Sequence, residues 1–167
     1  MVSASGREVG HRVTEYYYED LEVGQRFTTR TRIVTSSEVE LFSNLLGITN
    51  PAMFDAKAAA RVGFSGKITP GVLISAFAFG LEYQTGVFDN IVALLEIDQN
   101  RFKAPLMHGQ RLRSEIEVVS KRETSRQDRG IVVFQRHCYA DDVDIAEAKM
   151  TFLYSRRDVS KKKEPYD

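Results

Sequence analysis

The most apolar stretch of the chain covers residues 72–81, where Ser75 is the only polar side chain. Just before it, Thr69 is suited to cap a helix and Pro70 to stand in its first turn. We therefore predict a helix over residues 70–84, about 22 Å long at a rise of ~1.5 Å per residue. This helix is apolar nearly all round but too short for a bilayer, which takes about 20 residues, so it should be buried inside a soluble domain.

The segment before this helix predicts one strand and two shorter helices. Residues 27–34 alternate in the way that is typical of a strand. A capping box begins at Thr35 and opens a helix with one apolar face, which ends at Gly47. Residues 48–55 then form a loop, and the alanine-rich residues 56–62 predict a short helix.

Four stretches after the central helix predict long strands, at residues 91–102, 111–122, 131–140 and 144–155. The last three alternate apolar with polar side chains, as half-exposed antiparallel strands do. One apolar helix and one apolar sheet face can bury each other. We therefore expect an α+β hotdog fold, in which a curved antiparallel sheet wraps the long central helix.

Length and charge indicate one soluble domain. The 167 residues suit a single core, which we place at 16–156, between a flexible N-terminal tail over 1–15 and a charged C-terminal tail over 157–167. Basic and acidic residues each number 23, so nothing indicates a nucleic acid or a membrane as partner. A single cysteine, Cys138, and the lack of an apolar signal segment predict a cytoplasmic protein.

Four separated motifs together carry a family resemblance. They are Tyr-Tyr-Glu-Asp-Leu-Glu-Val-Gly-Gln (17–25), Gly-Ile-Thr-Asn-Pro-Ala-Met (47–53), Gly-Lys-Ile-Thr-Pro-Gly-Val-Leu (66–73) and Asn-Arg-Phe-Lys-Ala-Pro (100–105). In this order they resemble the MaoC-like dehydratases, the (R)-specific enoyl-CoA hydratase family. The resemblance implies the same hotdog fold, acyl-CoA or acyl-carrier thioesters as ligands, and domains that pair by joining their sheets edge to edge.

The loop at residues 47–53 departs from the family at the positions that matter most for catalysis. Active members carry Gly-Asp-x-Asn-Pro-x-His there, and the resemblance implies that the Asp and His move the proton of a water. In this chain those two positions hold Ile48 and Met53. Neither side chain is a general base near neutral pH, and such groups each contribute about 10²–10⁴-fold to a rate. We expect little hydratase activity unless another group substitutes.

The glycine that opens the long helix is the family element that this chain keeps. The resemblance implies that the backbone N–H of Gly71 polarises the thioester carbonyl, and the unpaired first N–H groups of a helix suit a developing enolate oxygen. A tight start of the helix at Pro70 and Gly71 is an equally good explanation of the same residues. The candidate substrate-binding residues are Gly71, Asn50 as loop support, Pro70, Phe54 and Phe77, although core packing also explains the phenylalanines.

Few other side chains are candidates for the missing chemistry. We interpret His108 as a solvated turn residue and His137 as exposed or paired on a strand, and Asp55 as the cap of the following helix. Glu82 is the best thioesterase-like carboxylate, but it lies about three turns, or roughly 16 Å, from Gly71. No two histidines have metal-ligand spacing, so we expect no metal and no other cofactor. Four basic residues could meet CoA phosphates or simply be solvated: Arg101, Lys103, Lys121 and Arg122.

Four hypotheses about function follow. In the first, the chain binds acyl-CoA or acyl-carrier thioesters but is non-catalytic alone, or is one subunit of a heterodimeric dehydratase whose partner, a similar hotdog chain, carries the Asp and His. The alternatives are an active enoyl-CoA hydratase or dehydratase with substitute groups, an acyl-CoA thioesterase, and a structural or regulatory hotdog homodimer. Whether the chain is an enzyme stays open at this point.

Overall fold

The structure is a computed structural model that describes residues 15–157. Its elements follow in the order η1 (Tyr18–Asp20), β1 (Arg26–Thr28), β2 (Arg32–Ile33), α1 (Ser36–Leu46), η2 (Pro51–Met53), α2 (Ala56–Arg61), α3 (Gly71–Tyr83), β3 (Ile91–Phe102), β4 (Arg111–Glu123), β5 (Arg129–Ala140) and β6 (Val143–Ser155). The predicted tails lie outside the described residues, apart from positions 15 and 157. Within residues 15–157, no helix is both long enough and apolar enough to cross a membrane.

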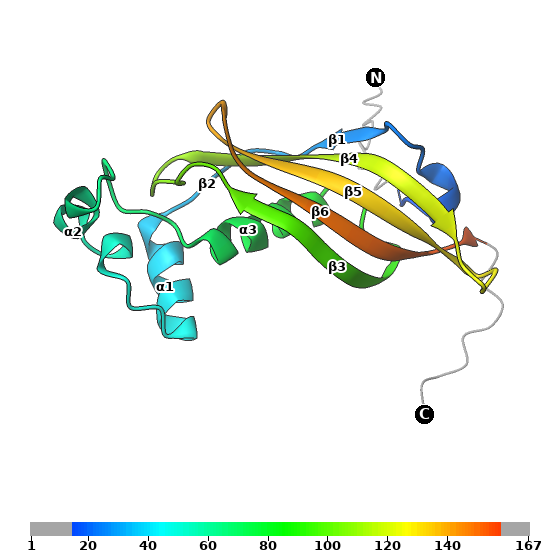
Figure 1. The fold of residues 1–167 in the computed structure, drawn as a ribbon, viewed down its shortest axis with the longest axis horizontal. Helices are drawn as coiled ribbons and strands as arrows, with labels where there is room; N and C mark the ends of the chain where they lie inside the picture. Colours follow the sequence, from blue (N-terminus) through cyan, green and yellow to red (C-terminus); the bar gives the residue numbers. More distant parts are fainter. Residues whose placement is uncertain (1–14, 158–167) are drawn as a thin grey trace, which may run out of the picture.

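The strands form one antiparallel sheet in the order β1-β4-β5-β6-β3, and β2 also pairs with β4. The predicted alternation is confirmed, because every second side chain is buried along β5, along β6 and along β4 as far as Val118. These side chains include Leu112, Ile116 and Val118 on β4, Val132, Phe134 and Cys138 on β5, and Ala146, Ala148, Met150, Phe152 and Tyr154 on β6. Helix α3 lies against this buried face (Figure 1), so the predicted α+β arrangement of a sheet curved over one long helix is confirmed.

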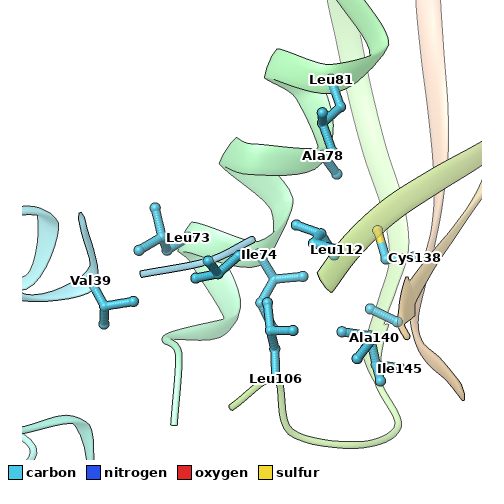
Figure 2. Close-up of a cluster of buried hydrophobic side chains, with 12 residues drawn as sticks. Val39, Leu73, Ile74, Ala78, Leu81, Leu106, Leu112, Cys138, Ala140 and Ile145 are labelled. Atoms are coloured by element: carbon cyan, nitrogen blue, oxygen red, sulfur yellow. The ribbon is translucent and has the colours of Figure 1, made fainter. Parts of the chain in front are cut away.

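Two clusters of buried side chains join helix and sheet. The first surrounds the N-terminal half of α3, where Ile74 and Ala78 lie beside Leu112 and Cys138 (Figure 2). The second is aromatic and centres on Phe88, whose ring lies 4.6 Å from that of Phe152 between centroids. Because the first cluster holds the start of α3 against the sheet, it also fixes the position of the residues at the N-terminal end of the helix.

Helix α3 begins one residue later than the sequence predicts. Its N-cap is Pro70, whose carbonyl accepts hydrogen bonds from the N–H groups of Leu73 (2.9 Å) and Ile74 (3.1 Å). The predicted cap by Thr69 is wrong, because Thr69 precedes the N-cap and its side chain makes no hydrogen bond. The caps predicted at Thr35 and Asp55 are confirmed: Thr35 accepts from the N–H of Glu38, and Asp55 accepts from that of Lys57.

A buried ion pair, absent from the sequence predictions, joins the last turn of α3 to β5. Arg136 donates two hydrogen bonds to Glu82, one of them at 2.7 Å, and the Ser114 hydroxyl donates a third at 2.5 Å. The guanidinium also lies 4.0 Å above the ring of Phe79. Burial raises the pKa of Glu82, and Arg136 opposes that effect. Glu82 is 0% exposed, so it is not placed to act as a thioesterase carboxylate.

The strand predicted over residues 27–34 is interrupted. The structure has two short strands, β1 and β2, with Thr29 buried between them. The hydroxyl of Thr29 accepts from the N–H of Ser114 at 2.9 Å, and this side-chain bond takes the place of a backbone bond of the sheet. A β-branched residue fits a strand by pattern, but its hydroxyl can also compete with the backbone for a donor.

One face of α3 stays exposed, contrary to the expectation that the chain itself would wrap the helix on most sides. This stripe consists of Val72, Ala76, Gly80 and Tyr83, which recur at helical spacing. The edge strand β3 is similarly uncovered along most of its length. Its exposed apolar side chains are Val92, Leu94, Leu95, Ile97 and Phe102. The residues described therefore leave an apolar surface on α3 and another on β3 without a cover.

Candidate functional site at the start of helix α3

The loop that carries Ile48 and Met53 is held in shape by its own backbone and by Asn50. The Asn50 side chain accepts from the N–H of Ala52 at 3.0 Å and caps the short η2 helix. The carbonyl of Ala52 in turn accepts from the N–H of Ile68 at 3.2 Å. The loop is thus fastened to the connector that leads into α3.

The turn at residues 106–110 fastens the other side of the same connector. The N–H of Thr69 donates to Leu106 at 2.8 Å, and that of His108 donates to Lys67 at 3.1 Å. Ile68 and Met107 form an isolated antiparallel bridge between the two segments. The chain on both sides of Thr69 is therefore fixed before the helix begins.

His108 is not the solvated turn residue that the sequence suggests. Its Nε2 lies 3.2 Å from the carbonyl oxygen of Ile68, and its Nδ1 lies 3.0 Å from the hydroxyl of Ser36. A carbonyl can only accept, so Nε2 carries the proton and Nδ1 accepts from Ser36. Burial lowers the pKa of His108, which favours this neutral form. The imidazole braces the connector against α1, and both of its nitrogens are occupied.

A cavity of about 350 Å³ opens at the N-terminal end of α3. Its lining comes from the connector, the first turn of α3 and the segment that follows β3: Phe64, Ile68, Thr69, Gly71, Ile74, Phe102, Lys103, Ala104 and Pro105. Most of these side chains are apolar. Lys103 supplies the only charge, and it is already paired with Asp144 (2.8 Å) and Glu147 (2.7 Å). None of the lining residues carries a carboxylate or an imidazole.

Gly71 lines this cavity at the first position of α3. Within the described part of the chain, no protein group accepts a hydrogen bond from its N–H. The amide also stands at the positive end of a 13-residue helix. The ring of Phe102 lies so close that a Cβ at position 71 would be 2.8 Å from it. A larger residue at position 71 would therefore have to displace the Phe102 ring, which is 45% exposed.

The other predicted site residues do not line the cavity. Phe77 packs into the first buried cluster, with the Arg32 guanidinium 3.9 Å above its ring. Pro70 is buried as the helix N-cap, and Phe54 is half-buried at the end of η2. Ile48 and Met53 are also half-buried in the fastened loop. Of the residues predicted to bind substrate, the structure places Gly71 alone in the cavity wall.

Sequence reasoning missed Phe64, Ile68, Thr69 and Phe102 as lining residues. Phe102 ends β3, and a strand that ends beside the start of a helix is a tertiary arrangement that no local pattern reveals.

Of the four basic residues that could meet CoA phosphates or be solvated, Lys121 has a different role. It donates to the carbonyls of Tyr18 and Leu21 and lies over the Tyr18 ring. It therefore secures the N-terminal segment to the sheet.

Chemically, the cavity offers a backbone donor at a helix N-terminus with apolar walls. Such a site can hold and polarise a carbonyl oxygen, but its lining has no group to add or remove a proton. The family model described as MaoC like domain matches residues 20–135. The chain belongs to the MaoC-like family. The resemblance predicted from the four motifs is thus confirmed.

Known proteins extend this MaoC-like relationship at low sequence identity. A mitochondrial 3-hydroxyacyl-acyl-carrier-protein dehydratase of Arabidopsis thaliana is 20% identical over 135 residues, which cover 79% of this chain and 77% of the relative. The (R)-hydratase from A. caviae is 24% identical, with a TM-score of 0.67 over 83% of this chain and 99% of its own. The HadBC dehydratase complex of Mycobacterium tuberculosis gives 23% identity and a TM-score of 0.66 over 78% and 96% of the two chains.

One similar structure is twice the length of this MaoC-like chain. RV0216 of Mycobacterium tuberculosis, described as a double hotdog fold, is 21% identical with a TM-score of 0.77. The match covers 93% of this chain but only 48% of RV0216. This chain therefore corresponds to one hotdog unit, and the hotdog fold is shown.

Proposed function

We propose that this MaoC-like chain binds acyl thioesters of CoA or acyl carrier protein at the start of α3 and does not hydrate or dehydrate them alone. The observation that carries the proposal is the free N–H of Gly71 in the cavity wall. A hydrogen bond from Ile68 to Ala52 joins the connector before α3 to the loop whose acid and base positions hold Ile48 and Met53. On this proposal, the chain keeps the backbone donor that would bind the thioester carbonyl and lacks the acid and base that would transfer the proton.

The chemistry of the cavity supports a thioester as the ligand. The carbonyl oxygen would accept from Gly71, where the helix dipole favours partial negative charge. The apolar lining suits the alkyl chain beside that carbonyl. Related proteins named as dehydratases or hydratases of 3-hydroxyacyl and (R)-hydroxyacyl groups agree with this ligand class.

The nearest titratable groups do not replace the acid and base. His108 is neutral but uses both ring nitrogens within the protein. Lys103 lines the cavity but is held by two carboxylates, which raise its pKa and keep it protonated. A group that is committed to such partners is poorly placed to take a proton from water.

The uncovered surfaces support a second hotdog chain as partner. Only one side of β3 is paired, with β6, and both β3 and the stripe of α3 expose apolar side chains. A second sheet that joins at β3 would cover the unpaired edge, because edge strands readily pair with another chain. We extend the proposal to a dimer with a second copy or with a hotdog chain that carries the Asp and His, as the HadBC complex joins two chains.

A matched pair of double variants tests the role of Gly71. Gly71→Ala/Phe102→Ala and Gly71→Pro/Phe102→Ala both remove the ring that a new Cβ would strike. Proline is well tolerated at the first helical position, and Pro70 already has the extended φ of −55° and ψ of 137° that a following proline requires. The two variants thus differ mainly in the N–H.

Binding of butyryl-CoA, measured by isothermal titration calorimetry, should be weaker for the proline variant by about 10-fold, the worth of one hydrogen bond to a polarised oxygen. Equal affinities would contradict the role of the N–H. Wild-type protein should bind butyryl-CoA and yet turn over crotonyl-CoA at a negligible rate. Rapid turnover by the pure chain would refute the non-catalytic half of the proposal, and absence of binding would refute the other half.

A further inference from the structure

Thr69 lines the same cavity and has a buried hydroxyl with no hydrogen-bond partner. The residue is 5% exposed, and its Oγ1 has no acceptor or donor among the described protein groups. Thr69 lines the cavity two positions before Gly71. Its backbone is fixed, because its N–H donates to Leu106 at 2.8 Å.

An unpartnered hydroxyl at this position needs an explanation. Taking a hydroxyl out of water without a replacement bond destabilises a fold, and most buried polar side chains have a partner. The ordinary reason for threonine before a helix is capping, but the N-cap is Pro70 and Thr69 makes no capping bond. Valine has the same shape and would fill the wall without this cost. The hydroxyl therefore suits a group that is not part of the protein.

The position of Thr69 indicates which group that is. Gly71 also lines this cavity and its N–H has no acceptor among the described residues, and a carbonyl oxygen has two lone pairs that can accept two donors. The remaining lining side chains, apart from the paired Lys103, are apolar and cannot bind such an oxygen.

We propose that the Thr69 hydroxyl and the Gly71 N–H together bind the carbonyl oxygen of an acyl thioester. This inference rests on the proposed function and adds a specific residue to it. Thr69 is a ligand-binding residue that recognises the thioester carbonyl, and it selects thioesters over ligands of the same shape that lack this oxygen. In a complex with a catalytic partner, the same two donors would hold the carbonyl while the partner moves the proton.

The test combines an isosteric variant, a conservative control and two matched ligands. Thr69→Val removes the hydroxyl and keeps the shape, and Thr69→Ser keeps the hydroxyl. The ligands are butyryl-CoA and butyl-CoA, a thioether that lacks only the carbonyl oxygen. Kd is measured by calorimetry, and the carbonyl stretching frequency of bound 1-¹³C-butyryl-CoA is measured by difference infrared spectroscopy.

We expect Thr69→Val to weaken butyryl-CoA binding by about 5- to 10-fold, the range of one net hydrogen bond, and to leave butyl-CoA binding unchanged. The carbonyl frequency should rise toward its value in free solution, while Thr69→Ser should retain the wild-type affinity and frequency. The ligand-free valine variant should melt at or above the wild-type temperature, because it loses an unpartnered hydroxyl.

The possible failures are distinguishable. If wild-type protein binds butyryl-CoA and Thr69→Val does so with the same Kd and carbonyl frequency, the assignment of Thr69 is overturned and the proposed function stands. If wild-type protein binds neither ligand, both are overturned. A ligand-free valine variant that melts several degrees lower would also overturn the assignment, because the hydroxyl would then have a structural partner.

Discussion

The buried pair of Glu82 and Arg136 allows a sharp prediction about stability. Glu82 has no exposed surface, the Arg136 side chain is 2% exposed, and the two form a bidentate ion pair. Replacement of Glu82 by Leu leaves a guanidinium enclosed between α3 and β5 without its counter-charge, and it also removes the acceptor of the Ser114 hydroxyl. The Nη1 of Arg136 has no hydrogen-bond acceptor even in the wild-type structure. No second acceptor is therefore close enough to replace the Glu82 carboxylate.

The cost follows from this complete burial. Loss of one member of a buried ion pair costs about 3–5 kcal/mol, because the other charge is left uncompensated. A domain of this size loses about 2–4 °C of Tm per kcal/mol, so Glu82→Leu should lower Tm by about 6–20 °C. Glu82→Gln keeps one acceptor oxygen and should fall near the lower end of that range.

A triple variant separates charge from packing. Glu82→Leu, Arg136→Met and Ser114→Ala together remove all three polar groups and keep similar volumes. Buried ion pairs replaced in this way are often neutral or stabilising, so the triple variant should unfold within about 1 kcal/mol of wild type or above it. Urea unfolding followed by circular dichroism gives the free energies, and calorimetry gives Tm.

Two results would refute this reasoning. A loss below about 1 kcal/mol for Glu82→Leu would mean that the charge is not buried as the structure has it. A triple variant as unstable as the single one would assign the cost to packing. The pair lies at the C-terminal end of α3, away from Gly71, so a folded triple variant should also keep the wild-type affinity for butyryl-CoA.

Three further predictions concern the site and its partner. The double variant Ile48→Asp/Met53→His should turn over crotonyl-CoA at least about 10²-fold faster than either single variant, because a general base typically contributes that much to the rate. No gain in rate would mean that these two positions do not reach the ligand. Leu95→Lys on β3 should convert a dimer to a monomer in light-scattering chromatography, whereas Ile33→Lys, similarly exposed but on β2 beside β4, should not. A dimer that survives Leu95→Lys would exclude β3 as the interface. Burial lowers the pKa of His108, so the unfolded chain binds a proton at this residue more readily than the folded protein does. Tm should therefore fall as the pH drops below about 6.5, and it should fall less in His108→Gln. Equal slopes of Tm against pH for the two proteins would contradict a buried neutral imidazole.

The architecture was predictable because each element carries its own local signal. Alternation in β4, β5 and β6 placed their apolar side chains on one face, and the capping residues Thr35 and Asp55 marked the starts of α1 and α2. The same alternation places Arg136 on the buried face between Phe134 and Cys138. A charged residue there signals a buried partner, and Glu82 is the lone acid in an otherwise apolar helix, so this pair could have been predicted.

The cavity could not be predicted in the same way. Its wall joins the connector before α3 to the end of β3, and these segments are distant in sequence. The family motifs include both segments, yet a motif does not state that Phe102 packs on Gly71 or that Thr69 lacks a partner. Such facts depend on where the chain folds back, which periodicity does not encode.

The loop with Ile48 and Met53 keeps its shape through hydrogen bonds made by other groups. Its shape depends on the Asn50 cap, on backbone bonds from Met53 to Asn50 and from Phe54 to Pro51, and on the bond between Ala52 and Ile68. None of these uses the side chain at position 48 or 53. Replacement of an acid and a base by apolar residues therefore need not move the loop or the start of α3. On the proposed function, the absence of the acid and base would therefore leave thioester binding intact, and a partner chain would supply both groups.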